Sequence, residues 1–93
     1  MVGAIVYVDR FGNLISTLTL AHLEEARSIA KYRQLFIRIG ERIIEGLVAS
    51  YSEGTVGQPS ALINSAGRLE VFVKEASVAD LLKARRGARI EVS

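Results

Sequence analysis

Residues 33–50, Arg-Gln-Leu-Phe-Ile-Arg-Ile-Gly-Glu-Arg-Ile-Ile-Glu-Gly-Leu-Val-Ala-Ser, contain the pattern that decides the fold. From Leu35 to Ile39 every second residue is aliphatic, which predicts a strand with one face in the core. Gly40-Glu41 is a good two-residue turn, and residues 42–50 are expected to form the returning strand. The stretch therefore predicts an antiparallel β-hairpin.

Outside this hairpin the chain repeats the pattern of short strands separated by turn residues. Further strands are predicted at 2–8, 14–18, 60–64, 69–73 and 88–92. Thr19 is expected to cap one short helix and Ser77 a second, with Gly87 as the stop signal of the second helix. The expected fold class is all-β: a single domain over residues 1–93, forming a small antiparallel β-barrel with one or two short helices, although a small sandwich fits the same pattern.

The composition is that of an ordinary globular chain with one core, since 49% of its 93 residues are hydrophobic and 24% are charged. The absence of cysteine excludes disulfides and thiolate metal sites, and it suits a cytoplasmic protein. No apolar run approaches the length that crosses a membrane, so no membrane partner is expected. The cluster Arg85-Arg86-Arg89 is short and is expected to be a solvated face.

The sequence contains no self-sufficient catalytic set. His22 is the only histidine and is expected on the first helix. Glu24 and Glu25 are neighbours on that helix and therefore point apart. The glycines match neither a phosphate-binding loop nor a dinucleotide fingerprint. We therefore expect no metal site and no activity from this chain alone.

A binding site is indicated by Asp9-Arg10-Phe11-Gly12-Asn13, which directly follows an apolar strand. Phe11 can stack on a planar heterocycle, and the Asn13 amide both donates and accepts hydrogen bonds, as the edge of adenine requires. Asp9 can hold a cation, and Gly12 allows the backbone to turn with positive φ. An ordinary turn with Phe11 anchored in the core fits the same residues.

Three later residues extend this hypothesis, each with an alternative. Tyr51 can cover the other face of a stacked base, or pack on the rim of the barrel. Ser65, beside a turn at Gly67, offers a hydroxyl and free backbone N–H groups to a carboxylate, or belongs to a plain hairpin loop. Glu70 is either an acceptor for an ammonium group or a solvent-facing residue, and its place in the strand alternation favours the solvent-facing interpretation.

Three segments carry a resemblance to a known family. They are residues 5–14 with Asp-Arg-Phe-Gly-Asn, residues 64–71, Asn-Ser-Ala-Gly-Arg-Leu-Glu-Val, and residues 75–79, Glu-Ala-Ser-Val-Ala. In order and spacing the chain resembles the C-terminal domain of the S-adenosyl-L-methionine hydroxide adenosyltransferases, which are relatives of fluorinase and chlorinase. The resemblance covers almost the whole chain.

The resemblance implies a two-domain enzyme, usually a homotrimer, whose substrate is S-adenosyl-L-methionine and which needs no further cofactor. Hydroxide attacks the 5′ carbon of the ribose, giving adenosine and L-methionine. The Asp, Arg and His that activate water belong to an N-terminal α/β domain. That domain is absent from this sequence, and we expect it in cis or in trans.

For the adenine end of the substrate, the resemblance implies that Phe11 and Tyr51 flank the base and that Asn13 contacts its edge. Backbone groups near Val73 and Glu75 complete the adenine pocket.

For the methionine end, the resemblance implies that Asp9 binds the α-ammonium group, with Glu70 assisting, and that Ser65 holds the carboxylate. Ala66 stands where the halogenating members have Arg, which argues against fluorinase chemistry.

Two other functions remain open from the residues themselves. The first is a stand-alone barrel that binds nucleic acid through its arginines, with Tyr7, Phe11 and Tyr51 as stacking platforms. The second is a structural trimerisation module. Basic and aromatic residues do not interleave along the chain, so no nucleic-acid partner is expected.

Overall fold

The expected hairpin is present in the computed structural model, where β3 (Phe36–Ile39) pairs antiparallel with β4 (Arg42–Glu45). Gly40 opens the two-residue loop with φ +58°, a conformation that favours glycine. Ile37 and Ile39 are buried, as the alternation predicted. The returning strand is shorter than expected, because the chain leaves the strand conformation at Gly46, where φ is +73°.

Seven antiparallel strands form one sheet in the spatial order β4-β3-β7-β1-β2-β6-β5. The structure describes residues 1–30 and 34–93. The remaining strands are β1 (Val2–Val8), β2 (Leu14–Thr19), β5 (Pro59–Ile63), β6 (Arg68–Val73) and β7 (Arg89–Val92). The helices are α1 (Leu20–Ala30), α2 (Val78–Leu82) and a single 3-10 turn, η1 (Tyr51–Glu53). The prediction of a mainly β fold with two short helices is confirmed.

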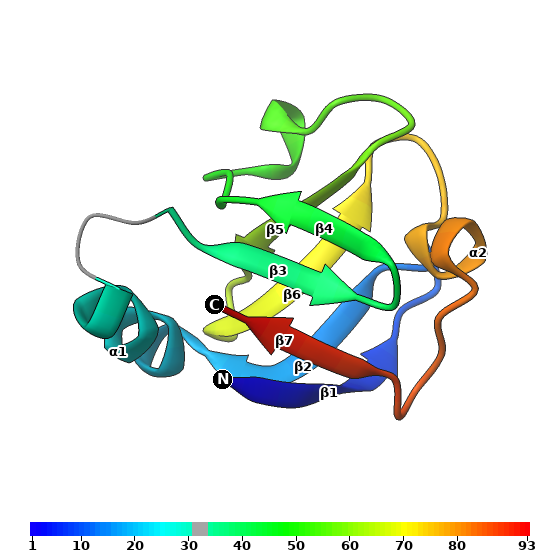
Figure 1. Cartoon of the computed structure of the whole chain (residues 1–93). Coiled ribbons are helices and arrows are strands. Elements are labelled where there is room, and N and C mark those ends of the chain that lie inside the picture. The colour runs from blue at the N-terminus through cyan, green and yellow to red at the C-terminus, as the bar shows by residue number, and fades with distance from the viewer. Residues whose placement is uncertain (31–33) are drawn as a thin grey trace.

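The sheet curls into a nearly closed barrel, with β4 in front of β5 in Figure 1. A backbone hydrogen bond of 2.9 Å from Val48 N–H to the Ala61 carbonyl ties the segment after β4 to β5, across the gap between the two edge strands. The enclosed core cluster is aliphatic. Its buried members are Ile5, Leu14, Leu18, Leu23, Leu35, Ile37, Ile39, Ile44, Ala61, Leu69, Val71, Val73, Val78, Ile90 and Val92.

The helices α1 and α2 lie at opposite ends of the barrel (Figure 1). Helix α1 begins after Thr19, whose Oγ1 accepts a hydrogen bond from the His22 N–H, while His22 Nδ1 accepts one from the Thr19 N–H. The expected Thr19 cap is therefore confirmed, and the imidazole serves as its reciprocal partner.

Helix α2 begins as expected, because the Ser77 hydroxyl accepts a hydrogen bond from the Asp80 N–H. The helix was expected to run through Lys83, which is confirmed, but Gly87 was wrongly predicted as its stop signal. The helix stops at Lys83, which adopts a left-handed φ of +52°, and Gly87 instead lies in the turn before β7. Lys83 provides the left-handed terminal conformation that glycine usually supplies.

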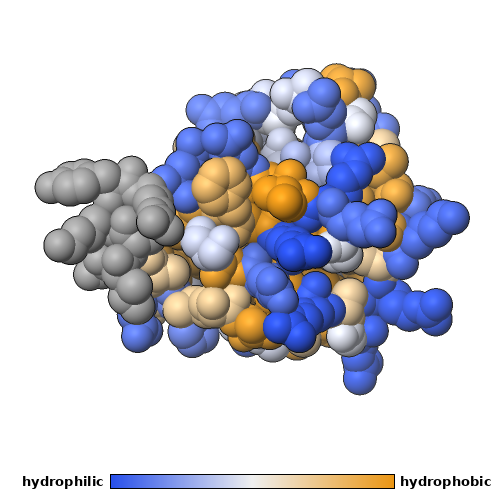
Figure 2. All heavy atoms as spheres, viewed as in Figure 1, coloured by the Kyte–Doolittle hydropathy of each residue, from blue (hydrophilic) through white to orange (hydrophobic). Residues whose placement is uncertain are grey.

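Hydrophilic side chains separate the apolar ones over β3, β4 and β7 on the face seen in Figure 2. Arg89 forms an ion pair of 2.7 Å with Glu91 on this part of the sheet. The cluster Arg85, Arg86 and Arg89 is exposed, in agreement with the solvated face that the sequence predicted. Among the described residues, no helix is long and apolar enough to cross a membrane.

We expect Ile37→Ala to lower the free energy of unfolding by about 2–5 kcal/mol, because it leaves a cavity in the aliphatic core. The matched control is Ile43→Ala on the neighbouring strand, where the side chain is 62% exposed and the change should stay within about 0.5 kcal/mol. Urea unfolding of both variants measures the difference. Equal losses of unfolding free energy would contradict the assignment of Ile37 to the core and of Ile43 to the solvent-exposed face.

Candidate functional site

A pocket of about 590 Å³ opens where three segments of the chain meet: the turn between β1 and β2, the η1 turn, and the chain leaving β6. Its lining residues are Phe11, Asn13, Tyr51, Ser52, Phe72, Val73, Lys74, Glu75 and Ala76. Of the eight residues expected to bind substrate, five lie on this wall: Phe11, Asn13, Tyr51, Val73 and Glu75. The structure thus brings together the residues expected at the adenine end, whereas Asp9, Ser65 and Glu70 do not line the pocket.

The turn between β1 and β2 is organised by Asp9. One carboxylate oxygen, Oδ1, accepts hydrogen bonds of 2.9 Å from the backbone N–H groups of Phe11 and Asn13. The Asp9 carbonyl accepts a third bond, from the Gly12 N–H at 2.9 Å. The second oxygen, Oδ2, accepts no hydrogen bond from the described part of the chain, so it can still bind a cation.

The Phe11 ring lies outside the core, with 63% of the residue exposed. The Arg10 guanidinium carbon lies 4.8 Å from the ring centroid, within the range of a cation–π contact. The alternative in which Phe11 anchors the turn in the core is therefore wrong. An exposed ring at the wall of a pocket has one face available to a flat ligand.

Gly12 is required at the turn for two reasons. Its φ of +81° is the left-handed conformation that favours glycine. In addition, a Cβ at this position would overlap the side chain of Ser77, the N-cap of α2. The Gly12 carbonyl also accepts a hydrogen bond of 2.9 Å from the Ala79 N–H. These contacts dock the turn against the start of α2.

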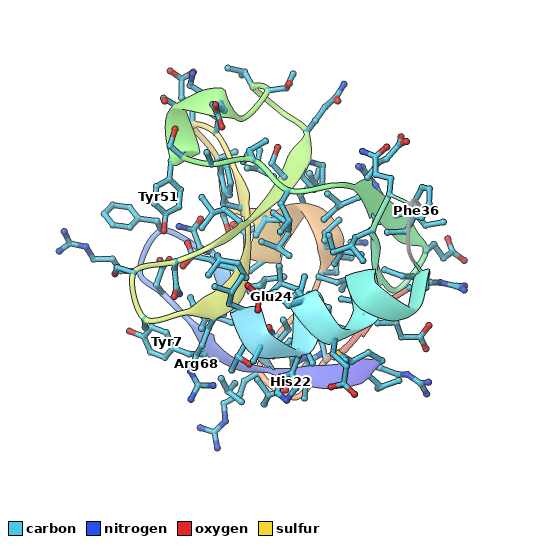
Figure 3. The ribbon with its side chains drawn as sticks, turned by 90° about the vertical axis from the view of Figure 1, so that its left-hand side faces the viewer. Tyr7, His22, Glu24, Phe36, Tyr51 and Arg68 are labelled. Atoms are coloured by element: carbon cyan, nitrogen blue, oxygen red, sulfur yellow. The ribbon has the colours of Figure 1, made fainter. Side chains whose placement is uncertain are left out.

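Tyr51 and Phe72 form another aromatic part of the pocket lining. Their ring centroids are 5.0 Å apart, and the rings are inclined by 70° in an edge-to-face arrangement. Figure 3 shows Tyr51 projecting from the η1 turn on the edge of the molecule that also carries Tyr7 and Arg68. Phe72 is buried beneath the η1 segment, where Gly54 packs so closely that a Cβ would lie 2.7 Å from the Phe72 ring.

The hydroxyl of Tyr51 points into the protein, although the residue as a whole is half exposed. It donates a hydrogen bond of 2.7 Å to Glu70 Oε2. Partial burial, this hydrogen bond, and the negative charges of Glu70 and Asp9 together raise the pKa of Tyr51 from 10.0 to about 12. Tyr51 therefore remains a hydrogen-bond donor throughout the physiological pH range.

Glu70 is buried, with only 4% of its surface exposed, so the solvent-facing interpretation is wrong. Its Oε2 accepts the hydrogen bond from Tyr51, and its Oε1 accepts one of 3.0 Å from Asn64 Nδ2. The alternation along β6 correctly placed Glu70 on the face away from the core. That face is covered, however, since all residues of the strand after Arg68 are buried.

The turn after β5 holds its own backbone donors. Asn64 Oδ1 accepts hydrogen bonds of 3.0 Å from the N–H groups of Ala66 and Arg68, and the Asn64 carbonyl accepts one from the Gly67 N–H. The free N–H groups expected here are therefore largely occupied. Ser65 is exposed on this turn, and its hydroxyl is the group it can offer to a ligand.

The last wall of the pocket is a tight turn after β6, closed by a 3.2 Å hydrogen bond from the Ala76 N–H to the Val73 carbonyl. Glu75 adopts a left-handed φ of +64° within it, which is uncommon for a residue other than glycine. Lys74 Nζ donates a 3.2 Å hydrogen bond to the Ser52 carbonyl and so joins this turn to η1.

Sequence reasoning missed four lining residues: Ser52, Phe72, Lys74 and Ala76. A signal existed for Phe72, because it shares its strand face with Glu70, two residues earlier. Ser52 and Ala76 directly follow expected site residues in the sequence, but nothing in the sequence indicated that they also line the pocket.

A family model described as SAM hydroxide adenosyltransferase C-terminal domain matches residues 3–91. The chain belongs to this family. Its fold is similar to that of an uncharacterized conserved protein from Thermotoga maritima, with a TM-score of 0.80 and 22% identity over 99% of this chain. It is also similar to a conserved hypothetical protein from Thermus thermophilus, with a TM-score of 0.78 and 29% identity over 99% of this chain.

This family domain spans only 35% and 34% of the lengths of those two solved structures. Comparison with curated protein sequences found no match.

We expect Gly12→Ala to lower the free energy of unfolding by about 1–2 kcal/mol from its positive φ, and by about 1–3 kcal/mol more from the overlap with Ser77. Gly57→Ala is the matched control, since Gly57 has φ +80° but open space around a Cβ. Chemical unfolding of the two variants compares the costs. If Gly12→Ala and Gly57→Ala lose the same unfolding free energy, Gly12 and Ser77 are not in close contact.

The raised pKa of Tyr51 predicts a loss of stability at high pH. The folded chain holds the phenol proton more tightly than the unfolded chain, so the stabilisation is complete below pH 10 and is lost as the pH rises toward about 12. Urea unfolding across this range should show a steeper decline for the wild type than for Tyr51→Phe. If the free energy of unfolding declines equally with pH in both proteins, the ionisation of Tyr51 is not the cause of the loss.

Proposed function

We propose that the pocket binds the adenosyl part of S-adenosyl-L-methionine, and that this domain supplies part of the site of an adenosylmethionine hydrolase. Membership of the family supports the proposal. The observation that carries it is the convergence of Phe11 and Asn13, from the β1–β2 turn, with Tyr51, from η1, on one pocket.

The pocket suits a nucleoside in size and chemistry. Its volume of about 590 Å³ lies within the range of small-molecule sites. Phe11 and Tyr51 supply aromatic surface for stacking, which is worth about 1–3 kcal/mol per base in nucleic-acid complexes. The Asn13 amide can pair with the adenine edge, and Val73 and Glu75, whose backbone groups can complete the contact, line the same pocket.

The methionine end of the substrate is assigned to the outer side of the β1–β2 turn. Asp9 keeps Oδ2 available for the α-ammonium group, and its charge is close enough to Tyr51 to affect that residue's pKa. Ser65 is assigned to the carboxylate through its hydroxyl. Both oxygens of Glu70 are already engaged by protein donors, so its contribution to binding the ammonium is through its negative charge.

In the proposed reaction, the oxygen of hydroxide bonds to the 5′ carbon of the ribose. The bond from that carbon to the sulfonium sulfur breaks, and its electron pair stays on sulfur, which leaves as the neutral thioether of methionine. The groups that activate water are assigned to an N-terminal α/β domain, in cis or in trans, within a homotrimer. A cytoplasmic location is part of the same proposal.

Phe11→Ala is expected to weaken adenosine binding about tenfold or more, because it removes a stacking surface. Calorimetric titration of the 93-residue chain with adenosine and with S-adenosyl-L-methionine measures the loss. Phe36→Ala is the control, since Phe36 is also a partly exposed phenylalanine but lies at the opposite edge of the molecule from Tyr51 (Figure 3).

Thermal stability of Phe11→Ala should change little, because the ring is outside the core. A variant that loses stability but retains its affinity for adenosine would contradict the stacking role. Repeating the titration at two salt concentrations tests the nucleic-acid alternative, since binding to phosphates weakens steeply with salt whereas adenosine binding should barely change. A purely structural module should bind none of these ligands.

The 93-residue chain alone is expected to release no methionine from S-adenosyl-L-methionine. Its only histidine, His22, caps α1, and no group of at least three metal-ligating side chains occurs within the described residues. Chromatography of the reaction mixture for adenosine and methionine measures turnover. Turnover that follows the purified chain through successive columns would place the chemistry in this domain.

A further inference from the structure

A partly buried network around the buried carboxylate of Glu70 connects the aromatic wall of the pocket to the turn after β5. The Tyr51 hydroxyl donates to one oxygen of Glu70, and the Asn64 amide donates to the other. The same Asn64 side chain accepts hydrogen bonds from the backbone of its own turn through Oδ1. Each polar group of the network therefore has its complementary partner within the protein.

We propose that Glu70 is a positioning residue, whose carboxylate fixes the orientation of Tyr51 as a wall of the adenosine pocket. The inference rests on the proposed function, because it assigns the role of Tyr51 in binding to its bond with Glu70. Asn64 orients the carboxylate from the other side. Glu70 thus acts on the ligand through Tyr51, without lining the pocket itself.

The chemistry of the network favours a carboxylate. The Tyr51 hydroxyl and the Asn64 amide both donate to Glu70, and an ionised carboxylate is acceptor-only, so it accepts both bonds. A glutamine could accept the bond from Asn64, but its own amide would then donate to the Tyr51 hydroxyl and reverse the direction of that bond. Burying a carboxylate is costly, and the two hydrogen bonds that Glu70 receives come from neutral groups. An apolar side chain would avoid that cost, but it would leave the Tyr51 hydroxyl and the Asn64 amide without a partner.

Other contacts hold the backbone of η1 but leave the direction of the Tyr51 side chain to this network. Glu53 Oε2 accepts hydrogen bonds from the N–H groups of Ala49 and Ser50 and so caps the turn. Lys74 binds the Ser52 carbonyl. The edge-to-face contact with Phe72 restrains the plane of the Tyr51 ring, whereas the hydrogen bond to Glu70 fixes the direction in which the side chain and its hydroxyl point.

The first test requires no ligand. The titration of the Tyr51 ring is followed by NMR in the wild-type chain and in Glu70→Gln, a substitution of nearly the same size. The pKa of Tyr51 should fall from about 12 but stay above 10.0, since partial burial and Asp9 still raise it. An unchanged pKa would overturn the proposal, because Tyr51 and Glu70 would not be in contact.

The second test measures adenosine affinity by calorimetry. Tyr51→Phe keeps the ring and removes the hydroxyl, and Glu70→Gln keeps the size and removes the charge. Each should weaken binding about fivefold to twentyfold. The double variant should bind no more weakly than the weaker single variant, because both changes remove the same bond from the Tyr51 hydroxyl to an ionised carboxylate. Tyr7→Phe is the matched control, since it removes a hydroxyl from an exposed tyrosine outside the pocket.

The outcomes separate this inference from the proposed function. Binding of adenosine by Tyr51→Phe with wild-type affinity, or losses that add in the double variant, would overturn the positioning role while the proposed function stands. Failure of the wild-type chain to bind either adenosine or S-adenosyl-L-methionine would count against the proposed function itself. Melting curves of all variants ensure that affinities are compared between folded proteins.

Discussion

The site depends on the burial of strand β6 on both of its faces. One face contributes Leu69, Val71 and Val73 to the aliphatic core. The other carries Glu70 and Phe72, which are covered by the η1 segment rather than by water. A strand covered on both sides is a rigid support, and rigid support is what a binding site needs. The pocket lies where this strand ends, at Val73 and the turn that follows it.

Some polar groups at the site are used in hydrogen bonds that hold the protein together, and others remain available to a ligand. The Oδ1 atom of Asp9 holds the turn that carries Phe11 and Asn13, and its Oδ2 atom remains available to a ligand. Asn64 is wholly engaged in building its turn and in holding Glu70. The groups left for a ligand are therefore few and well placed: an exposed ring, a side-chain amide, a hydroxyl and one carboxylate oxygen.

The fold could be predicted from the sequence because it follows from local pattern. The alternation at residues 35–39, the turn at Gly40 and the caps at Thr19 and Ser77 act over a few residues, and the structure confirms each of them. Gly87 was wrongly predicted as the stop signal of α2, because Lys83 itself adopts the conformation that glycine usually supplies.

The candidate site was only partly predictable, for a different physical reason. A period of two tells which side chains share a face, but it does not tell what covers that face. Glu70 was therefore assigned to solvent, and Phe72 was overlooked, although both lie beneath η1. Free N–H groups were expected near Ser65, because the sequence does not show that the Asn64 side chain folds back on its own turn, a local alternative that asparagine often adopts.

The packing of Gly12 against Ser77 makes the ligand-bearing turn and the start of helix α2 one cooperative unit of local unfolding. The Ala79 amide is bonded to the Gly12 carbonyl, so its hydrogen exchanges with solvent only when the turn and the helix separate. A ligand that binds only while the turn is docked must slow this exchange, by the factor by which its binding stabilises the docked state. A backbone amide outside the pocket thus reports its occupancy.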